Sequence, residues 1–545
     1  MAFASHGLTH RSTVTATRGM VSSAHPLASV AGLRILMQGG NAIDAAAATA
    51  AALNVVEPYM SGIAGVGYMH VYSADNGTHQ VLDYVGLTPA QTRLSLYQDE
   101  RDSIRGPLAV LVPGACGGWA EALQRLGSMP LDEVFRPAIE YAERGFALTV
   151  KNHAFFAGSA ADLQRFPASV SAFLPQGTAP LPGSVLIQAD LARTLRMIAE
   201  GGAEVFYQGA LADRMVDHVQ QAGGVLTKDD LRQFRPVWVD PVHADYRGWR
   251  IYAPPPPCQA IQILQTMGIM EGYELAAMGH NTVDTLHRFI EATKLAMADR
   301  IRYAAVADPP TAALLDRRYT ASRRALITGR AQYTGGERYT PPGKVPRVEA
   351  GDPGAQVKQE CTTHFDVIDD RGNAVAVTQS LGTSFGSAMV VPGTGVLLNG
   401  FMRWFDLEPQ SPNVIGPAKK NEMCLSPVQV WDDAGLRLLI GTPGSYGILQ
   451  TTPQMLMNVL DHGMNVQAAI EAPRVKTGRP GFAVDVETRI PAAVLTELEK
   501  RGHDLTRLGD WHASLGGGQA IAVDPESGAF MGGADPRRDG YALGW

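Results

Sequence analysis

Residues 362–380 read TTHFDVIDDRGNAVAVTQS, and apolar and polar residues alternate on both sides of the segment DDRGN. A period of two is typical of a strand with one buried face, and Asp, Gly and Asn favour turns. The stretch therefore predicts a β-hairpin. The following residues, SAMVVPGTGVLLN at 387–399, are rich in β-branched and apolar side chains and predict a further strand.

The register of this hairpin can be counted from its turn. If the turn spans Asp369 to Asn373, Ile368 faces Ala374, and Thr362 then faces Ser380. Residues directly opposite each other have Cβ atoms about 4.5–5.5 Å apart. A hydroxyl of Ser380 would thus lie within reach of Thr362, although a Thr/Ser pair across two strands is by itself a common structural feature.

Helical patterns dominate most of the chain before the hairpin. A first helix is predicted to end at Gly39 and Gly40, and Asn41 is a suitable cap for a second, alanine-rich helix. A glycine-rich turn and a strand follow. Helices are predicted within 26–60, 115–145, 187–222 and 282–304.

A long segment without apolar period, residues 328–361, separates the last of these helices from the hairpin. Connections of this length are uncommon inside a compact protein and are often functional. A plain linker between domains is the alternative interpretation.

Composition limits the classes of function. The 545 residues are 45% hydrophobic and carry a net charge of -7, which disfavours a general nucleic-acid binder. Four cysteines with no zinc spacing favour a reducing compartment. The N-terminal residues lack a signal-peptide pattern, and Ala42–Val56 is too short for a membrane span. We expect a cytoplasmic protein that binds neither membranes nor nucleic acids.

The familiar cofactor and metal motifs are absent from the sequence. The glycines between Gly62 and Gly67 have the reverse of the dinucleotide-binding spacing and precede a predicted strand. We expect no cofactor and no metal. Residues 382–386, GTSFG, match the pattern of a nucleophile elbow around Ser384. Such an elbow joins a strand to a helix, whereas strands are predicted on both sides here, so an ordinary turn is favoured.

Several segments resemble the γ-glutamyltransferase family, in order and along nearly the whole chain. They are residues 39–69 (GGNAIDAAAATAAALNVVEPYMSGIAGVGYM), 112–119 (VPGACGGW), 291–303 (EATKLAMADRIRY), the hairpin and its continuation to 399, 441–445 (GTPGS) and 532–540 (GGADPRRDG).

The resemblance implies an N-terminal nucleophile hydrolase of the α+β class, with a four-layer αββα sandwich. Such a protein is made as one precursor that cleaves itself, here between Cys361 and Thr362. The products would be a large subunit, 1–361, and a small subunit, 362–545, intertwined in one folded unit. Whether several such heterodimers assemble into an oligomer is left open.

The resemblance also implies the catalytic residues. Thr362 would be the nucleophile, with its own α-amine, of reference pKa about 7.7–8.0, as the base. Ser380 matches a supporting threonine of the family, in agreement with the hairpin register. Backbone amides at Gly444 and Ser445 would form the oxyanion hole.

The sequence departs from the family where its members bind the α-carboxylate and α-amine of a γ-glutamyl group. The charged and polar residues of those members align with Val85, Gly382, Phe401, Trp404, Met423 and Cys424. A buried carboxylate without a charged partner costs several kcal/mol. Arg403 is a nearby cation that could bind a different carboxylate if it faces the pocket, and is otherwise a surface residue.

We therefore expect a self-processing amidohydrolase that acts on a small-molecule amide, with an acyl group other than a standard γ-glutamyl. Cephalosporin acylases and oxamate amidohydrolases are divergent members of this kind. The alternatives are a genuine glutathione hydrolase or γ-glutamyltransferase, a self-cleaving but catalytically idle binding protein, and an unrelated esterase using Ser384. The acyl group, the leaving amine and the balance between hydrolysis and transfer are left open.

Overall fold

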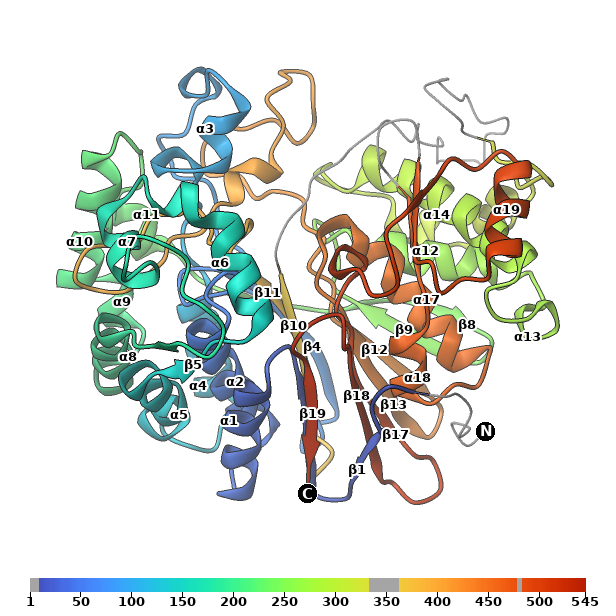
Figure 1. Ribbon diagram of the computed structural model, residues 1–545, viewed down its shortest axis with the longest axis horizontal. Coiled ribbons are helices and arrows are strands. Elements are labelled where there is room, and N and C mark those ends of the chain that lie inside the picture. The colour runs from blue at the N-terminus through green and yellow to red at the C-terminus, as the bar shows by residue number, and fades with distance from the viewer. Residues whose placement is uncertain (1–8, 333–361, 478–482) are drawn as a thin grey trace. The chain divides into compact units, whose positions relative to one another are not determined.

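The hairpin that the sequence predicts is formed by β10 (Thr363–Asp369) and β11 (Ala374–Ser380). In the computed structural model their register runs from Ile368 opposite Ala374 to Thr363 opposite Gln379, as counted from the turn. The structure describes residues 9–332, 362–477 and 483–545 (Figure 1).

The described residues fall into two compact units. Unit 1 lies within Met1–Thr15, Pro241–Gln359 and Glu422–Arg537, and unit 2 within Ala16–Asp240, Glu360–Asn421 and Arg538–Trp545. Each unit therefore contains segments from both sides of the predicted cleavage position. The subunit boundary itself stays a prediction, and Cys361 lies outside the described residues.

The hairpin belongs to the seven-stranded antiparallel sheet of unit 2, in the order β19-β2-β10-β11-β3-β4-β7. The remaining strands are β2 (Gly19–Ser23), β3 (Val66–Ser73), β4 (Thr78–Asp83), β7 (Val237–Val239) and β19 (Tyr541–Gly544). Both strands of the hairpin are fully buried and lie between strands from the N-terminal part of the chain.

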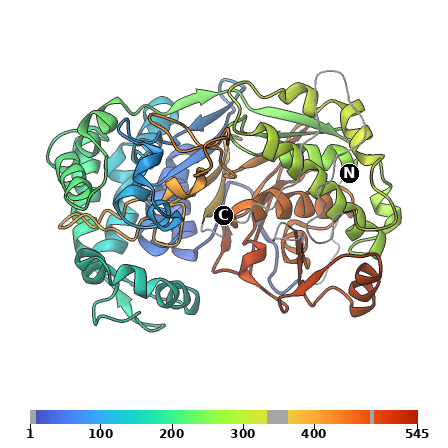
Figure 2. The same cartoon turned by 90° about the horizontal axis from the view of Figure 1, so that it is seen from above.

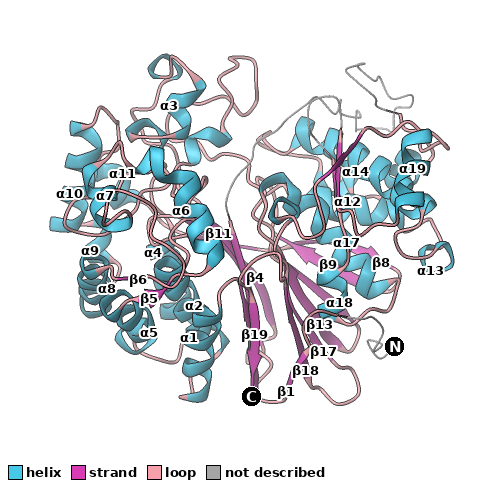
Figure 3. Ribbon diagram, in the orientation of Figure 1, coloured by secondary structure: helices cyan, strands magenta, loops and turns pink. Residues whose placement is uncertain are grey.

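Two helices pack on this sheet, α1 (Pro26–Met37) on β2 and β19, and α2 (Ala42–Val56) on β10 and β11 (Figure 3). Asn41 caps α2, and a capping box with Asp44 satisfies the first free amides. All 15 residues of α2 are buried. The small alanine side chains allow this helix to approach both the sheet and its neighbouring helices.

Among the other helices of unit 2, α4 and α5 pack against α2, and α8 packs against α5. These other helices are α3 (Glu100–Ile104), α4 (Ala115–Leu126), α5 (Leu131–Arg144), α6 (Val150–Leu163), α7 (Pro167–Phe173), α8 (Ala189–Gly201), α9 (Glu204–Tyr207), α10 (Ala210–Gln221) and α11 (Lys228–Gln233). A two-stranded sheet, β5 (Phe146–Ala147) and β6 (Val185–Leu186), joins this region. The helices predicted within 26–60, 115–145 and 187–222 are thus confirmed.

Unit 1 contains a second seven-stranded sheet, in the order β1-β18-β17-β13-β12-β9-β8. The strands are β1 (Val14–Ala16), β8 (Val242–Tyr246), β9 (Trp249–Ala253), β12 (Val428–Asp432), β13 (Gly435–Gly441), β17 (Gln519–Val523) and β18 (Phe530–Ala534). A smaller sheet is formed by β14 (Val475–Lys476), β15 (Val484–Val486) and β16 (Leu505–Arg507).

Helices α12, α17 and α18 pack on the larger sheet of unit 1, and α14 packs on α12 (Figure 1, Figure 2). The helices of this unit are α12 (Ile261–Met270), α13 (Leu275–Met278), α14 (Val283–Tyr303), α15 (Thr311–Leu314), α16 (Arg317–Arg324), α17 (Ile448–Leu460), α18 (Val466–Glu471) and α19 (Ala492–Lys500). The helix predicted within 282–304 is α14, which Thr282 caps.

The strand predicted at 387–399 is wrong. Residues 381–400 are irregular apart from one isolated bridge between Val390 and Leu397. The backbone φ is positive at Ala388 and at Gly393, which takes these residues out of the extended region. The apolar side chains of this segment are buried in loops that fold back on themselves, not in a ladder.

No helix of the described residues combines the length and apolar character that a membrane span needs.

Candidate active site

The hairpin places the two predicted hydroxyl residues at the same end of its ladder. Thr362 immediately precedes β10, whose first pair is Thr363 opposite Gln379, and Ser380 is the last residue of β11. Thr362 is 1% exposed and Ser380 is 2% exposed. Both hydroxyls therefore lie in a part of the protein from which bulk water is excluded.

The turn after β11 joins Ser380 to two further predicted residues. The amide of Gly382 donates a hydrogen bond to Ser380 Oγ at 2.8 Å. Gly382 has a φ of +92°, and a Cβ at this position would lie 2.8 Å from the carbonyl oxygen of Gly400 and 3.1 Å from Phe401 Cγ. Ser380, Gly382 and Phe401 are thus neighbours, and the close approach requires a glycine at 382.

Phe401 begins a short 3₁₀ helix, η3 (Phe401–Trp404), which contains the predicted site residues Phe401, Arg403 and Trp404. Phe401 and Trp404 are buried, whereas Arg403 is partly exposed. Asn399, just before η3, is fixed by hydrogen bonds with the backbone of Leu111. That these two aromatic side chains contact the substrate stays a prediction.

Ser384 does not lie on a nucleophile elbow. No helix follows β11 among residues 381–400, and Ser384 Oγ lies 3.0 Å from Ser159 Oγ. The loop is instead fixed by Arg105, whose guanidinium donates to Thr383 Oγ1 and to the carbonyl of Gly386 and pairs with Asp162 at 2.7 Å. Sequence analysis missed Arg105 because it belongs to no motif.

Val85 is buried two residues after β4. Its amide donates to Asp83 Oδ1 at 2.9 Å, and Asp83 Oδ2 lies 2.5 Å from Lys420 Nζ. Lys420 is a second cation that sequence analysis missed, because it is more than 300 residues away along the chain. It adds a charged group beside the position at which the related sequences have an arginine.

The predicted oxyanion-hole residues lie in unit 1, in the turn between β13 and α17. Gly444 has a φ of +133° and Ser445 a φ of +59°, and Ser445 begins the 3₁₀ turn η4 (Ser445–Gly447) that leads into α17. Successive backbone amides at the start of a helix form a favourable site for negative charge. The positive φ of a non-glycine residue marks a constrained backbone at this turn.

Met423 and Cys424 are fully buried in unit 1. The amide of Met423 donates to Pro257 O at 3.1 Å, and its carbonyl accepts from Gln259 N at 2.7 Å. The preceding Glu422 accepts a hydrogen bond of 3.4 Å from Tyr446, which follows Ser445 in the chain. This segment and the turn at Gly444 are therefore close to each other within the unit.

The predicted site residues are thus distributed over both units. Unit 2 contains Val85, Thr362, Ser380, Gly382, Phe401, Arg403 and Trp404, and unit 1 contains Met423, Cys424, Gly444 and Ser445. That the two sets line one pocket stays a prediction.

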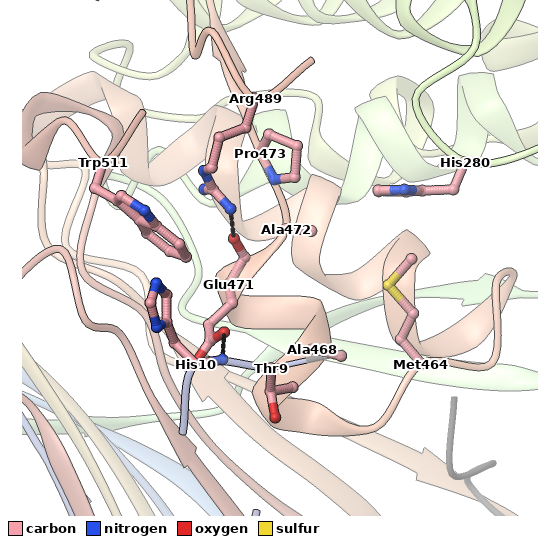
Figure 4. Close-up of a pocket in the computed structure, with 10 residues that line it drawn as sticks. All are labelled: Thr9, His10, His280, Met464, Ala468, Glu471, Ala472, Pro473, Arg489 and Trp511. Carbon is pink, nitrogen blue, oxygen red and sulfur yellow. Dashed lines mark hydrogen bonds between the residues drawn. The ribbon is translucent and has the colours of Figure 1, made fainter. Parts of the chain in front are cut away.

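A pocket of about 430 Å³ in unit 1 contains none of the predicted residues. The carboxylate of Glu471 accepts hydrogen bonds from the amides of His10 and Arg11, and Arg489 lies over the ring of Trp511 (Figure 4). The described residues contain no group of three or more His, Cys, Asp or Glu arranged to hold a metal ion.

Comparison with known proteins agrees with this architecture. Residues 28–545 match the gamma-glutamyltranspeptidase family. The acylase ACY 1 proenzyme of Pseudomonas sp. (strain V22) is 38% identical over 550 residues, which are 96% of this chain and 93% of that protein. The glutathione hydrolase proenzyme of Escherichia coli (strain K12) is 34% identical over 554 residues, covering 96% and 91%.

The solved structures include a cephalosporin acylase from Bacillus halodurans that matches with a TM-score of 0.88 and 34% identity, over 99% of this chain and 98% of that one. The fold class predicted from the sequence is confirmed by this match. The chain belongs to the gamma-glutamyltranspeptidase family and is an amide-bond hydrolase with the N-terminal nucleophile hydrolase fold.

Proposed function

We propose that this protein is a self-processing amidohydrolase whose nucleophile is Thr362. The observation that supports this most directly is the register of the hairpin, in which Thr362 directly precedes the first pair, Thr363 opposite Gln379, and Ser380 ends the facing strand. In the precursor the Thr362 hydroxyl attacks the carbonyl carbon of Cys361, and the peptide bond is exchanged for an ester. Water then hydrolyses the ester and leaves Thr362 with a free α-amine.

The new α-amine serves as the base for the second reaction. Its reference pKa of about 7.7–8.0 leaves much of it unprotonated near neutral pH. It takes the proton of the Thr362 hydroxyl as the oxygen attacks a substrate amide, and returns it to the leaving amine. Water completes the cycle by hydrolysing the acyl-enzyme. Amides at Gly444 and Ser445 are proposed to stabilise the oxyanion, at about 2.7–4 kcal/mol per donor in other enzymes.

The proposed acyl group lacks the α-amine of a γ-glutamyl group. Phe401 and Trp404 are buried aromatic side chains at positions where related enzymes have polar ones, and Gly382 leaves no room for a longer side chain. Arg403 and Lys420 are the cations proposed to receive a carboxylate at the far end of the acyl group. The names of the acylase ACY 1 and of the cephalosporin acylase support such a substrate.

Glutathione hydrolysis remains the second candidate. The 34% identity with the glutathione hydrolase proenzyme of Escherichia coli extends over nearly the whole chain and favours it. A panel of oxamate, glutaryl anilide and γ-glutamyl anilide separates the two. We expect clear turnover of an acyl group without the α-amine, and weak turnover of the γ-glutamyl anilide. Glutathione hydrolysis with a kcat/KM of about 10⁴ M⁻¹s⁻¹ or more would contradict the proposed specificity.

Chain cleavage is tested on denaturing gels of the purified protein. Dividing 58.2 kDa in proportion to residues 1–361 and 362–545 gives bands of about 38.5 and 19.7 kDa. N-terminal sequencing of the small chain should begin TTHFDV. Thr362→Ala should stay uncut and inactive, because both steps use the same hydroxyl.

We also propose a cytoplasmic location. The supporting observation is that four cysteines in 545 residues are too few for a disulfide framework, and that Cys116, Cys258 and Cys424 are buried, as in a protein of a reducing compartment. Cell fractionation with antibodies against the small chain tests this.

A further inference from the structure

Glu57 is a buried carboxyl group that lies behind the first strand of the hairpin. It follows the last residue of α2, is 2% exposed, and its Oε2 accepts a hydrogen bond of 3.0 Å from Thr363 Oγ1. Side chains point alternately to the two faces of a strand. Thr362 and Thr363 are consecutive, so their side chains point to opposite faces. The hydrogen bond from Thr363 to Glu57 therefore restrains the backbone without occupying the Thr362 hydroxyl.

The start of β10 needs such a restraint because its backbone pairing is one-sided there. β10 pairs with β11 from Thr363 onward, but its pairing with β2 begins only at Phe365, opposite Ser23. The first two residues of the strand thus have a ladder on one edge. The hydrogen bond from Thr363 to Glu57 adds an attachment to a helix at this point.

Cleavage makes this attachment more important. In the precursor Thr362 is held by covalent bonds on both sides, whereas in the cleaved protein it is a chain terminus, and termini fray unless they are tied down. An active site of this kind requires its reacting groups within about 0.5 Å of the productive geometry. We propose that Glu57 is a positioning residue that fixes the nucleophile through Thr363 once the chain is cut. This inference rests on the proposed function of Thr362.

Two charged residues of a third segment of unit 2 act electrostatically on the Glu57 carboxyl. The charge of the buried Arg538 acts on the carboxyl, and the guanidinium of Arg538 lies 5.6 Å from the ring centroid of Phe155. Asp539, which also acts on Glu57, accepts a hydrogen bond of 2.5 Å from Thr149.

The anchor does not depend on the charge of Glu57. Burial raises its pKa to about 7, although Arg538 and the hydrogen bond from Thr363 oppose the shift. An ionised and a protonated carboxyl both offer an oxygen that can accept the Thr363 hydrogen bond. A glutamine side chain also offers such an oxygen, whereas alanine does not.

The test compares variants on both sides of the contact. Thr363→Val removes the donor without changing the shape, and Glu57→Ala removes the acceptor. Both should lower kcat about tenfold or more with KM changed less than about twofold, on the anilide of the panel that the wild type hydrolyses fastest. Combining them should cost little beyond either alone. Thr363→Ser and Glu57→Gln should recover most of the rate.

Thr49→Val is the matched control. Thr49 lies on the same helix α2, is fully buried, and its hydroxyl donates to Ala45 O at 2.8 Å. The Thr49→Val substitution removes a buried threonine hydroxyl just as Thr363→Val does. It should leave kcat and KM near those of the wild type even if it lowers the melting temperature. Chain cleavage before Thr362 should continue in all these variants.

Two results would overturn the inference. If the wild type is not cut before Thr362, or Thr362→Ala hydrolyses the anilide, the proposed function fails and the inference with it. If the wild type is cut there and Thr362→Ala is inactive, but Thr363→Val keeps the full kcat, only the positioning role of Glu57 is refuted. Thr363→Val decides the matter even if Glu57→Ala fails to fold.

Discussion

Ser380 Oγ accepts a hydrogen bond of 2.8 Å from the amide of Gly382, two residues further along the chain. This bond constrains the Ser380 side chain at the end of β11, which is the end of the hairpin at which Thr362 precedes β10. The proposed role of Ser380, support of the proposed nucleophile Thr362, follows from this position.

Ser380→Ala should slow both chain cleavage and amide hydrolysis, by about ten- to a hundredfold, because a buried hydrogen bond is lost near the reacting oxygen. Gel densitometry of freshly purified precursor and steady-state kinetics measure the two rates. Ser380→Thr keeps the hydroxyl and is the control. Cleavage of Ser380→Ala at the wild-type rate would remove Ser380 from the mechanism.

Gly382→Asn, which restores the residue type of γ-glutamyl enzymes, should not restore γ-glutamyl activity. A Cβ would approach the carbonyl oxygen of Gly400 to 2.8 Å, and the φ of +92° strains any side chain. We expect a loss of about 1–3 kcal/mol in the free energy of unfolding. The matched control is Gly223→Asn, at a φ of +95° with nothing within 4 Å of the added Cβ. Equal losses in the two variants would show that the contact with Gly400 is unimportant.

The pKa of Glu57 predicts a pH dependence of stability. The folded-state pKa of about 7 lies above the ordinary glutamate pKa of 4.5, so the folded protein binds this proton more tightly than the unfolded chain does. Stability should therefore fall as the pH rises from about 4.5 to 7, by about 3 kcal/mol in total.

Urea unfolding of the uncut Thr362→Ala chain at several pH values measures this dependence. Adding Glu57→Gln should remove this pH dependence. The free energy of unfolding of the Glu57→Gln protein, relative to that of its parent, should therefore increase with pH. Parallel curves for the two proteins would show that Glu57 does not titrate in this range.

The motif GGADPRRDG contributes a buried ionic network in unit 1. Arg537 lies 2.5 Å from Glu487 and 3.1 Å from Asp535, and Arg474 lies 2.6 Å from Asp535, with all four side chains fully buried. Asp535→Asn leaves buried positive charge uncompensated and should destabilise the protein by about 3–5 kcal/mol, measured by urea unfolding.

Burial alone would raise the pKa of Asp535, but Arg537 and Arg474 outweigh it and lower the pKa to about 2. The stabilisation is therefore complete above a pH of about 4 and is lost as the pH falls through 2. Glu497→Gln is the control, since its pair with Lys500 is exposed at the surface and should change stability by less than about 1 kcal/mol. A similarly small effect of Asp535→Asn would contradict the network's role.

Local patterns in the sequence were sufficient for the hairpin and for α2. The turn fixes the register of β10 and β11, and Asn41 with Asp44 sets the start of the helix within four residues. The strand predicted at 387–399 failed because apolar, β-branched composition gives no information on backbone angles. The amide of Val391 instead bonds to Val396 O and closes a short turn.

The contacts that complete the site could not be read from any local pattern. Glu57 and Thr363 are 306 residues apart, and Asp83 and Lys420 are 337 apart. Such pairs are brought together by the order of strands in a sheet and by the helices packed on it. The sequence therefore indicated the proposed nucleophile and its neighbour, but not these distant contacts.

The strand order of unit 2 has a consequence for how the protein refolds before and after cleavage. In β19-β2-β10-β11-β3-β4-β7, the three strands that follow residue 361 (β19, β10 and β11) lie among four that precede it, so the proposed cut leaves two chains interleaved in one sheet. The uncut Thr362→Ala chain should renature from urea at a rate independent of its concentration. The cut protein must first reunite two separate polypeptides, so its renaturation becomes second-order and fails in dilute solution. Hydrolysis of a single peptide bond thus converts a fold that one chain can recover after unfolding into a fold that two separate chains do not recover in dilute solution.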